Sequence, residues 1–275
     1  MAEISAATVM SLRGKTGLPM MECKKALAAT GGDETAAIEW LRKQGIKTKE
    51  SRIDRDTECG RVAAYADLAR KVGAMVEVKC ESAPVANSPE FRAFTNDLAK
   101  QLALGPGAKT PDELLKQPSL ATPGKTLGEQ KDDMFNRIRE VMNVTRVVRI
   151  DGPCGAYAHH DGSAASLVEI TGDSAEAAKD IAMHIVAMKP RYVSKEDVDP
   201  AAVAKEREIL SEAAKTEGKP EAIIAKMVEG RLKNFYAEHT LLEQPFVKDN
   251  ALSVGKVAGG AKIKVVRFIH WELGK

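Results

Sequence analysis

Residues 62–78 read VAAYADLARKVGAMVEV, and the fold class follows from this pattern. Apolar residues alternate along its first half, and a second apolar run follows a charged segment, as in two strands joined by a short turn. Gly73 is expected to help form that turn. Apolar residues then recur every three or four positions, at Phe91, Phe94, Leu98 and Leu102. The sequence therefore predicts a β-hairpin followed by a helix.

The same pattern returns later in the chain. AYA at 64–66 matches AYA at 156–158, and VEV at 76–78 matches VEI at 168–170, so 156 − 64 and 168 − 76 both give an offset of 92. A constant offset through the hairpin indicates an internal duplication, with chance similarity of two hairpins as the alternative. Another amphipathic helix follows the second copy and is expected to end at Lys189-Pro190.

The first fifty residues predict three short helices. Ser5 is placed to cap the first helix, and Gly17 to end it. Asp33 follows a pair of glycines and is placed to cap the third helix, which Gly45 is expected to end. This pattern is typical of a ubiquitin-associated-type bundle.

The remaining chain completes an α+β fold. A Gly- and Pro-rich connection precedes a helix predicted over 127–142, and an αα-hairpin is predicted at about 199–236. Alternation near the C-terminus predicts a last strand that returns to a sheet. The predicted domains are a ubiquitin-associated-like domain (1–55), a first core half (56–143) and a second core half containing the helical hairpin (144–275).

The composition favours an ordinary globular protein without a cofactor. The 275 residues carry 41 Lys and Arg against 39 Asp and Glu, and this balance lacks the positive excess that drives nucleic-acid binding. The N-terminus carries neither a basic flank nor a long apolar run, so we expect a cytoplasmic protein without a membrane anchor. Four cysteines stand singly, without the spacing of metal ligands.

No motif supports catalysis. HHDG at 159–162 places two imidazoles beside a carboxylate, but adjacent strand residues point to opposite faces, and Asp161-Gly162 is a turn signal. We therefore expect a surface turn in which His159 and His160 diverge. The sequence lacks a phosphate-binding glycine loop and a Gly-x-Ser-x-Gly elbow, so we do not expect an enzyme.

The segment TGLPMMECKKAL at 16–27 is similar to the N-terminal signature of the elongation factor Ts family. Further segments match the family in order, namely IAMHI at 181–185, KMVEGRLK at 226–233 and QPFV at 244–247. This resemblance implies an N-terminal ubiquitin-associated-like domain and a duplicated core with an inserted helical hairpin. It also implies a guanine-nucleotide exchange factor for the translational GTPase elongation factor Tu.

One departure falls where the resemblance implies that exchange is concentrated. The family carries Thr-Asp-Phe-Val after the second core strand, and its Asp and Phe approach the Mg²⁺ site of the partner. Here the same register gives Ser82, Ala83, Pro84 and Val85. Without the carboxylate and the ring, we expect a loop that acts through volume, backbone and rigidity, although it could also serve only as a strand-to-helix connection.

Met20 and Met21 open the second helix beside Pro19, where we expect at least one of them to be displayed to a partner. The resemblance places His159 near a contact histidine of the family, and Leu12 is a further candidate contact. Burial of both methionines in the bundle core is the alternative reading of their helical spacing. A ubiquitin-associated-type adaptor without exchange activity remains a second functional class, and a ribosome- or RNA-binding accessory factor is a third. Exchange kinetics and salt-dependent RNA binding would separate these classes. Homodimerisation through the helical hairpin also stays open.

Overall fold

The protein is an α+β chain, and the computed structural model describes residues 4–50, 52, 54–216 and 221–275. It divides into two compact units. The first holds the chain up to Arg61, then Val76–Val148 and Gly274, and the second holds Val62–Met75, Arg149–Leu273 and Lys275. The domain boundaries expected from the sequence stay a prediction.

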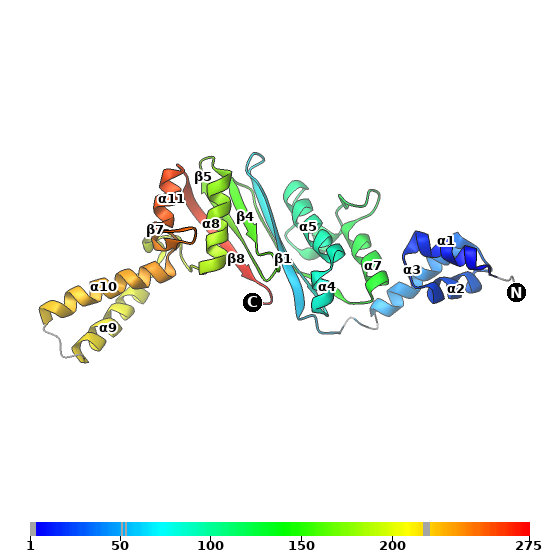
Figure 1. Ribbon diagram of the computed structural model, residues 1–275, viewed down its shortest axis with the longest axis horizontal. Coiled ribbons are helices and arrows are strands. Elements are labelled where there is room, and N and C mark those ends of the chain that lie inside the picture. Colours follow the sequence, from blue (N-terminus) through cyan, green and yellow to red (C-terminus); the bar gives the residue numbers. More distant parts are fainter. Residues whose placement is uncertain (1–3, 51, 53, 217–220) are drawn as a thin grey trace. The chain divides into compact units, whose positions relative to one another are not determined.

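The N-terminal bundle forms as its capping residues predict (Figure 1). Its helices are α1 (Ala6–Thr16), α2 (Met20–Ala29) and α3 (Glu34–Glu50). Ser5 caps α1, Gly17 ends it with a φ of 68°, and the Asp33 carboxylate accepts bonds from the first turn of α3. The expected stop at Gly45 is wrong, because Gly45 keeps a helical backbone and α3 continues to Glu50. Glycine lowers helix propensity without forbidding a helix.

The first sheet contains the predicted hairpin. Its strands are β1 (Cys59–Asp67), β2 (Val72–Cys80) and β3 (Met142–Ile150), in the order β1-β2-β3. Lys71, with a φ of 54°, closes the turn by donating its N–H to Leu68 O at 3.2 Å. Gly73 therefore lies in β2 and not in the turn. A Cβ at this position would lie only 2.4 Å from Cys154 Sγ, so close packing explains the glycine.

The helices after the hairpin are α4 (Ala83–Asn87), α5 (Pro89–Leu104), α6 (Pro111–Leu115) and α7 (Leu127–Ile138). Among them, α5 is the helix with the predicted periodicity. The apolar positions of α5 singled out in the sequence are all buried. The helix predicted over 127–142 ends four residues early, because Arg139 adopts a left-handed backbone with a φ of 65°.

The second sheet repeats the arrangement of the first. Its strands are β4 (Cys154–Ala158), β5 (Ala164–Thr171) and β8 (Lys264–Glu272), in the antiparallel order β4-β5-β8. In both sheets a hairpin is extended by a later strand beside its second strand. Glu77 and Glu169, 92 residues apart, each pair with an arginine on that later strand, namely Arg146 and Arg267. An internal duplication of the hairpin accounts for this match.

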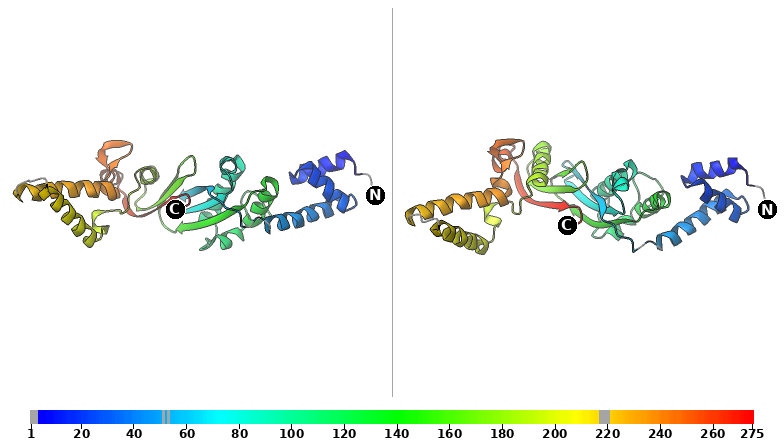
Figure 2. Two further views of the ribbon diagram at one scale, coloured as in Figure 1. Left: turned by 90° about the horizontal axis from the view of Figure 1, so that it is seen from below. Right: turned by 60° about the horizontal axis from the view of Figure 1, so that its bottom comes forward.

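The helix α8 (Ala175–Met188) covers one face of this sheet, as Figures 1 and 2 show. It ends where the sequence predicts, because Lys189 adopts a left-handed backbone with a φ of 49° before Pro190. Val168 and Ile170 of β5 and Ile181 and Ile185 of α8 are buried in the core between them. This core fixes one wall of the groove described below.

The predicted helical hairpin consists of α9 (Pro200–Thr216) and α10 (Glu221–His239), which pack on each other around Ile224, Val228 and Leu232. The residues between these two helices, 217–220, lie outside the described residues. Several short elements were not predicted, namely η1 (Lys195–Asp197), η2 (Leu241–Glu243), β6 (Pro245–Phe246), β7 (Asp249–Ser253) and α11 (Val254–Gly260).

Candidate functional site

Residues 82–85 form the start of a helix rather than the expected loop. Ser82 is the N-cap of α4, and Pro84 lies in its first turn, where proline's missing N–H costs no hydrogen bond. Ala86 N donates to Ser82 O at 3.1 Å and closes this turn. Ala83 and Pro84 are exposed, whereas Val85 is half-buried. The segment therefore presents a small, rigid, apolar surface.

Two glutamates fix the start of α4. The Glu140 carboxylate accepts hydrogen bonds from Ser82 N at 3.0 Å and from Ser82 Oγ at 2.6 Å. The neighbour of Ser82, Glu81, accepts in turn from the neighbour of Glu140: Val141 N donates to the Glu81 carboxylate at 2.7 Å. Arg55 Nη1 donates to the same carboxylate at 2.9 Å. Because the two carboxylates act reciprocally, they join residues 81–82 to residues 140–141. We call this arrangement the Glu81–Glu140 staple.

Protonation states agree with these bonds. Burial opposes ionisation of Glu81, but the bonds from Val141 N–H and Arg55 outweigh it and lower the pKa of this carboxyl. Burial, aided by the charge of Glu140, raises the pKa of the Cys80 thiol to about 12. Cys80 therefore remains a thiol, and it donates to Ser82 O at a sulfur–oxygen distance of 3.3 Å.

The N-terminal bundle displays two of its three predicted contact residues. Met20 and Met21 begin α2 and expose 46% and 63% of their surface, so the alternative that both belong to the core is wrong. Leu12, in contrast, is fully buried among Val9 and Leu27. Its side chain is therefore part of the bundle core and is not available to a partner.

His159 lies in the turn between β4 and β5. Gly162 N donates to His159 O at 2.8 Å, and His159 Nδ1 lies 2.7 Å from the Asp161 carboxylate. Although burial opposes ionisation, bonds from Ser163 and His159 lower the pKa of Asp161. The expected divergence of His159 and His160 is wrong, because both follow the end of β4 and their ring centroids lie 4.3 Å apart.

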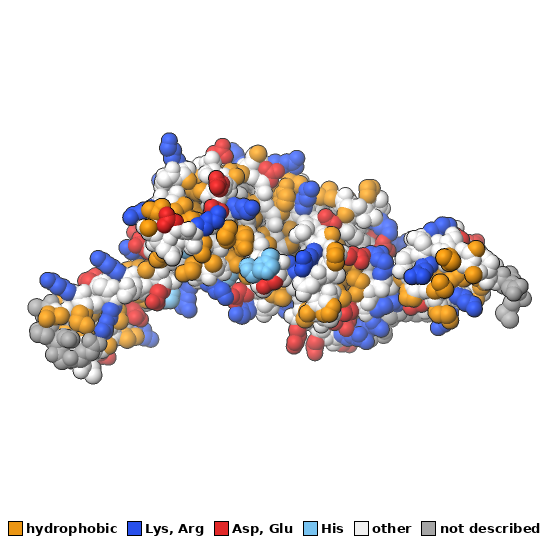
Figure 3. Space-filling model, in the orientation of Figure 1, with side chains coloured by type: hydrophobic (Ala, Val, Ile, Leu, Met, Phe, Trp, Pro, Cys, Tyr) orange, Lys and Arg blue, Asp and Glu red, His pale blue; other side chains and the backbone are white. Residues whose placement is uncertain are grey.

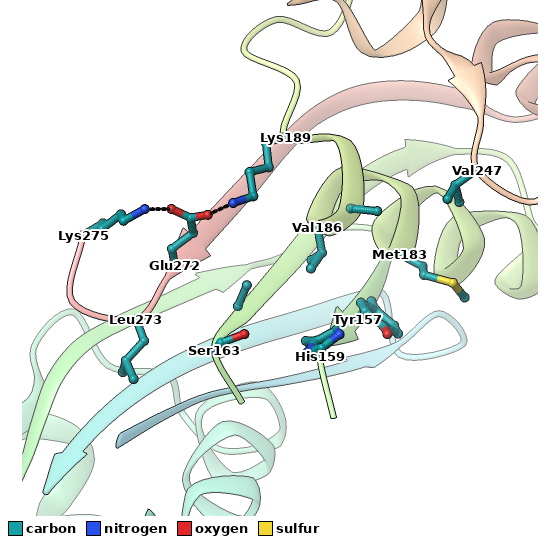
Figure 4. A pocket seen from close by; sticks show the side chains of 12 residues that line it. Tyr157, His159, Ser163, Met183, Val186, Lys189, Val247, Glu272, Leu273 and Lys275 are labelled. Carbon is teal, nitrogen blue, oxygen red and sulfur yellow. Dashed lines mark hydrogen bonds and ion pairs between the residues drawn. The ribbon is translucent and has the colours of Figure 1, made fainter. Parts of the chain in front are cut away.

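His159 also borders a groove of about 650 Å³ in the second unit (Figure 4). Its walls are largely apolar and come from Tyr157, His159, Ser163, Ala164, Met183, Val186, Ala187, Lys189, Val247, Glu272, Leu273 and Lys275. At one end, Glu272 lies between Lys189 and Lys275, as the dashed lines in Figure 4 mark. Hydrogen bonds from Lys189, the larger cause, and from Lys275 lower the pKa of Glu272 to about 2. The groove therefore combines an apolar wall with a charged end.

A buried histidine positions one wall of this groove. Val247 N donates to His184 Nδ1 at 3.1 Å, so the ring proton is on Nε2, which donates to Gln244 Oε1 at 2.9 Å. The His184 ring also stacks on Phe246. These contacts join the IAMHI and QPFV segments of the sequence. Neither segment alone revealed the pairing, because 60 residues separate His184 from Gln244.

The predicted site residues thus form separate surfaces. Residues 82–85 and the two methionines belong to the first unit, and His159 belongs to the second. On the face shown in Figure 3, basic and acidic side chains are interspersed. Among the described residues there is no cluster of His, Cys, Asp and Glu that could hold a metal ion. In the same part of the chain, no helix is long and apolar enough to cross a bilayer.

Comparison with known proteins identifies the family of this chain. Residues 84–275 match the family described as "Elongation factor TS". The chain is 42% identical over 275 residues to elongation factor Ts of Methylococcus capsulatus, covering 99% of this chain and 92% of that protein. It is 39% identical to elongation factor Ts of Saccharopolyspora erythraea, over the full length of both proteins. From similarity of this extent we conclude that the chain belongs to the elongation factor Ts family.

Proposed function

We propose that this protein is a guanine-nucleotide exchange factor for elongation factor Tu and acts in the cytoplasm during protein synthesis. Family membership is the single observation that carries the proposal. Exchange makes and breaks no covalent bond, so the protein is not an enzyme in the usual sense. It needs only to bind the nucleotide-free GTPase more tightly than the GDP-bound form, by about 1.4 kcal/mol for each tenfold loss of nucleotide affinity.

The first contact is made by α4 at the Mg²⁺ side of the partner's nucleotide site. Ala83 and Pro84 are exposed on a helical turn that the Glu81–Glu140 staple already holds in place. A preorganised element loses little conformational entropy on docking. Since neither side chain is charged, α4 acts by volume and rigidity and does not compete for the ion.

Two other surfaces hold the partner. Met20 and Met21 offer flexible, polarisable apolar contacts, which suit an interface that must adapt to different nucleotide states. The groove beside His159 accepts an apolar segment of the partner, with His159 at its edge. Contacts on separate surfaces divide the large differential binding energy that exchange requires.

Release of a fluorescent GDP from elongation factor Tu tests this function. Addition of the protein at micromolar concentration should accelerate release by at least about a hundredfold, equivalent to lowering the activation free energy of release by ~3 kcal/mol. A ubiquitin-associated-type adaptor would bind the GTPase and leave the release rate unchanged. Binding without acceleration would therefore reject the exchange function and favour the adaptor.

A further inference from the structure

Two cysteines lie at the open end of the β1–β2 hairpin. Both strands contain nine residues, so counting outward from the turn pairs Asp67 with Val72 and brings Cys59 opposite Cys80. The surroundings of Gly60 agree with this register. A Cβ at Gly60 would lie 2.2 Å from Val78 O and 2.8 Å from the Cα atom of Lys79, so the two backbones approach closely beside Lys79, the residue expected opposite Gly60.

Residues opposite each other on antiparallel strands point to the same face, with Cα atoms about 4.5–5.5 Å apart. A disulfide spans Cα separations of about 4.4–6.8 Å, so this pair lies within the required range. An electrostatic effect supports the proximity. Burial and the charge of Glu140 are the main causes of the raised pKa of Cys80, and negative charge on Cys59 is a further, smaller cause.

The two thiols differ in access. Cys59 is half-buried and open to a small solute, whereas Cys80 is fully buried. Cys23 lies in the bundle core of the first unit, and Cys154 belongs to the second unit, so neither faces another cysteine in this way. An oxidant therefore reaches Cys59 first, and Cys80 is the thiol positioned to resolve it.

We propose that Cys59 and Cys80 are a peroxide-sensitive pair that forms a reversible disulfide beneath α4. The Cys59 thiolate attacks hydrogen peroxide and cleaves the O–O bond, which gives a sulfenic acid and, after protonation of the leaving hydroxide, water. As the Cys80 thiol attacks the sulfenic sulfur, its proton passes to the departing hydroxyl oxygen, so that the S–O bond breaks, the S–S bond forms and a second water leaves. Two thiols are oxidised and one peroxide is reduced.

This disulfide alters the anchoring of α4. The Cys80 thiol donates to Ser82 O, the carbonyl that also accepts from Ala86 N in the first turn of α4. Oxidation removes the thiol proton and draws the sulfur toward Cys59. The Ser82 carbonyl then loses one donor, and the first turn of α4 opens more often.

Peptide mapping of the full-length protein tests the disulfide. Tryptic cleavage separates Cys59, in the peptide 56–61, from Cys80, in the peptide 80–92. After mild treatment with hydrogen peroxide and alkylation, we expect these peptides to be linked in monomeric protein and separated by dithiothreitol. Hydrogen exchange at 85–87 should accelerate about threefold in the oxidised protein, as expected for loss of one weak bond.

Two variants provide the controls. Cys59→Ser should abolish the link and the change in exchange, and the Cys23→Ser, Cys154→Ser double variant should keep both. Over-oxidation of Cys59 without a link to Cys80 would overturn the proposal, as would a link found only in dimers. Unchanged exchange at 85–87 in fully linked wild-type protein would overturn the coupling to α4.

Discussion

At the scale of single residues, Glu140 determines how firmly α4 begins. Its carboxylate accepts both the N–H and the hydroxyl of Ser82 in a half-buried position. Glu140→Ala leaves both donors without this acceptor, so we expect the free energy of unfolding to fall by about 2 kcal/mol. Urea denaturation measures the loss. Glu208→Ala, at an exposed position on α9, should stay within about 0.5 kcal/mol of wild type. Equal stability of the two variants would show that Glu140 does not stabilise the start of α4.

His184 makes stability depend on pH. Burial lowers its pKa, and the bond to Gln244 offsets this only in part. Below pH about 6.5 the unfolded chain therefore binds a proton that the folded chain does not, and stability falls as the pH falls. The slope contributed by one histidine is at most about 1.4 kcal/mol per pH unit. Burial lowers the pKa of His270 too, so part of the slope belongs to that residue.

Urea denaturation between pH 7.5 and 5.5 separates the contribution of His184. We expect His184→Gln, which cannot titrate, to be less stable at pH 7.5 but to lose less stability on acidification than wild type. His160→Gln, at an exposed position, is the matched control and should keep the wild-type slope. An unchanged slope in His184→Gln would contradict a neutral, buried His184.

Local chemistry made some of these residues predictable from the sequence. Ser5, Gly17 and Asp33 act within one helical turn of their own positions, so their capping roles follow from neighbouring residues. The role of Glu140 does not, because its partner Ser82 is 58 residues away. Gly73 was misassigned for the same reason, since the nearby Cys154 comes from a distant strand.

At the scale of elements, α4 is the part of the first unit on which the proposed exchange mechanism depends. Pro84 restricts the backbone of its first turn, and glycine there would add freedom worth about 1 kcal/mol. We expect Pro84→Gly to slow stimulated GDP release about fivefold while the affinity for nucleotide-free elongation factor Tu changes less than about twofold. Stopped-flow fluorescence and titration give the two values.

Pro89→Gly is the matched control for this change. Pro89 lies in the first turn of α5 as Pro84 lies in the first turn of α4, and both prolines are exposed. If Pro89→Gly slows release as much as Pro84→Gly, the effect reflects general loosening of the unit. If neither variant slows release, exchange depends on the methionines and the groove instead of α4.

The helical hairpin presents a different surface. Ile209 of α9 and Ile223 of α10 expose 50% and 47% of their area, although the hairpin buries its own core. We propose that these residues contribute to a homodimer. Sedimentation should then show a dimer at tens of micromolar that Ile209→Lys with Ile223→Lys converts to a monomer. Wild-type protein that stays monomeric at this concentration would exclude the dimer.

Periodicity predicted long elements better than short ones. The β1–β2 hairpin, α5, α8 and β8 carry clear alternation or helical spacing, and the structure confirms them. In contrast, α4 has only five residues, too few for a periodic pattern, and its helical turn depends on Ser82, Pro84 and the distant Glu140. The sequence therefore identified the segment 82–85 as a candidate site but assigned it the wrong conformation.

At the scale of the whole molecule, the proposed contacts are divided between the two units. Met20 and Met21 belong to the first unit and His159 to the second. The methionines lie on the bundle, whereas His159 bonds to Asp161 in its own turn and borders the groove. Sites without shared neighbours contribute independently to binding free energy. This independence permits a quantitative test of the proposed division.

The test combines Met20→Ala and Met21→Ala with His159→Ala. The Met20→Ala, Met21→Ala double variant and the His159→Ala variant should each bind nucleotide-free elongation factor Tu about tenfold more weakly than wild type. This loss of ~1.4 kcal/mol is the cost of truncating a moderate interface anchor. Because the effects add, the triple variant should bind about a hundredfold more weakly than wild type. Calorimetric titration gives the affinities, and thermal unfolding verifies that each variant is folded. A triple variant no weaker than His159→Ala alone would show that the exposed methionines do not contact the partner, and the bundle would then contribute nothing to the complex through α2.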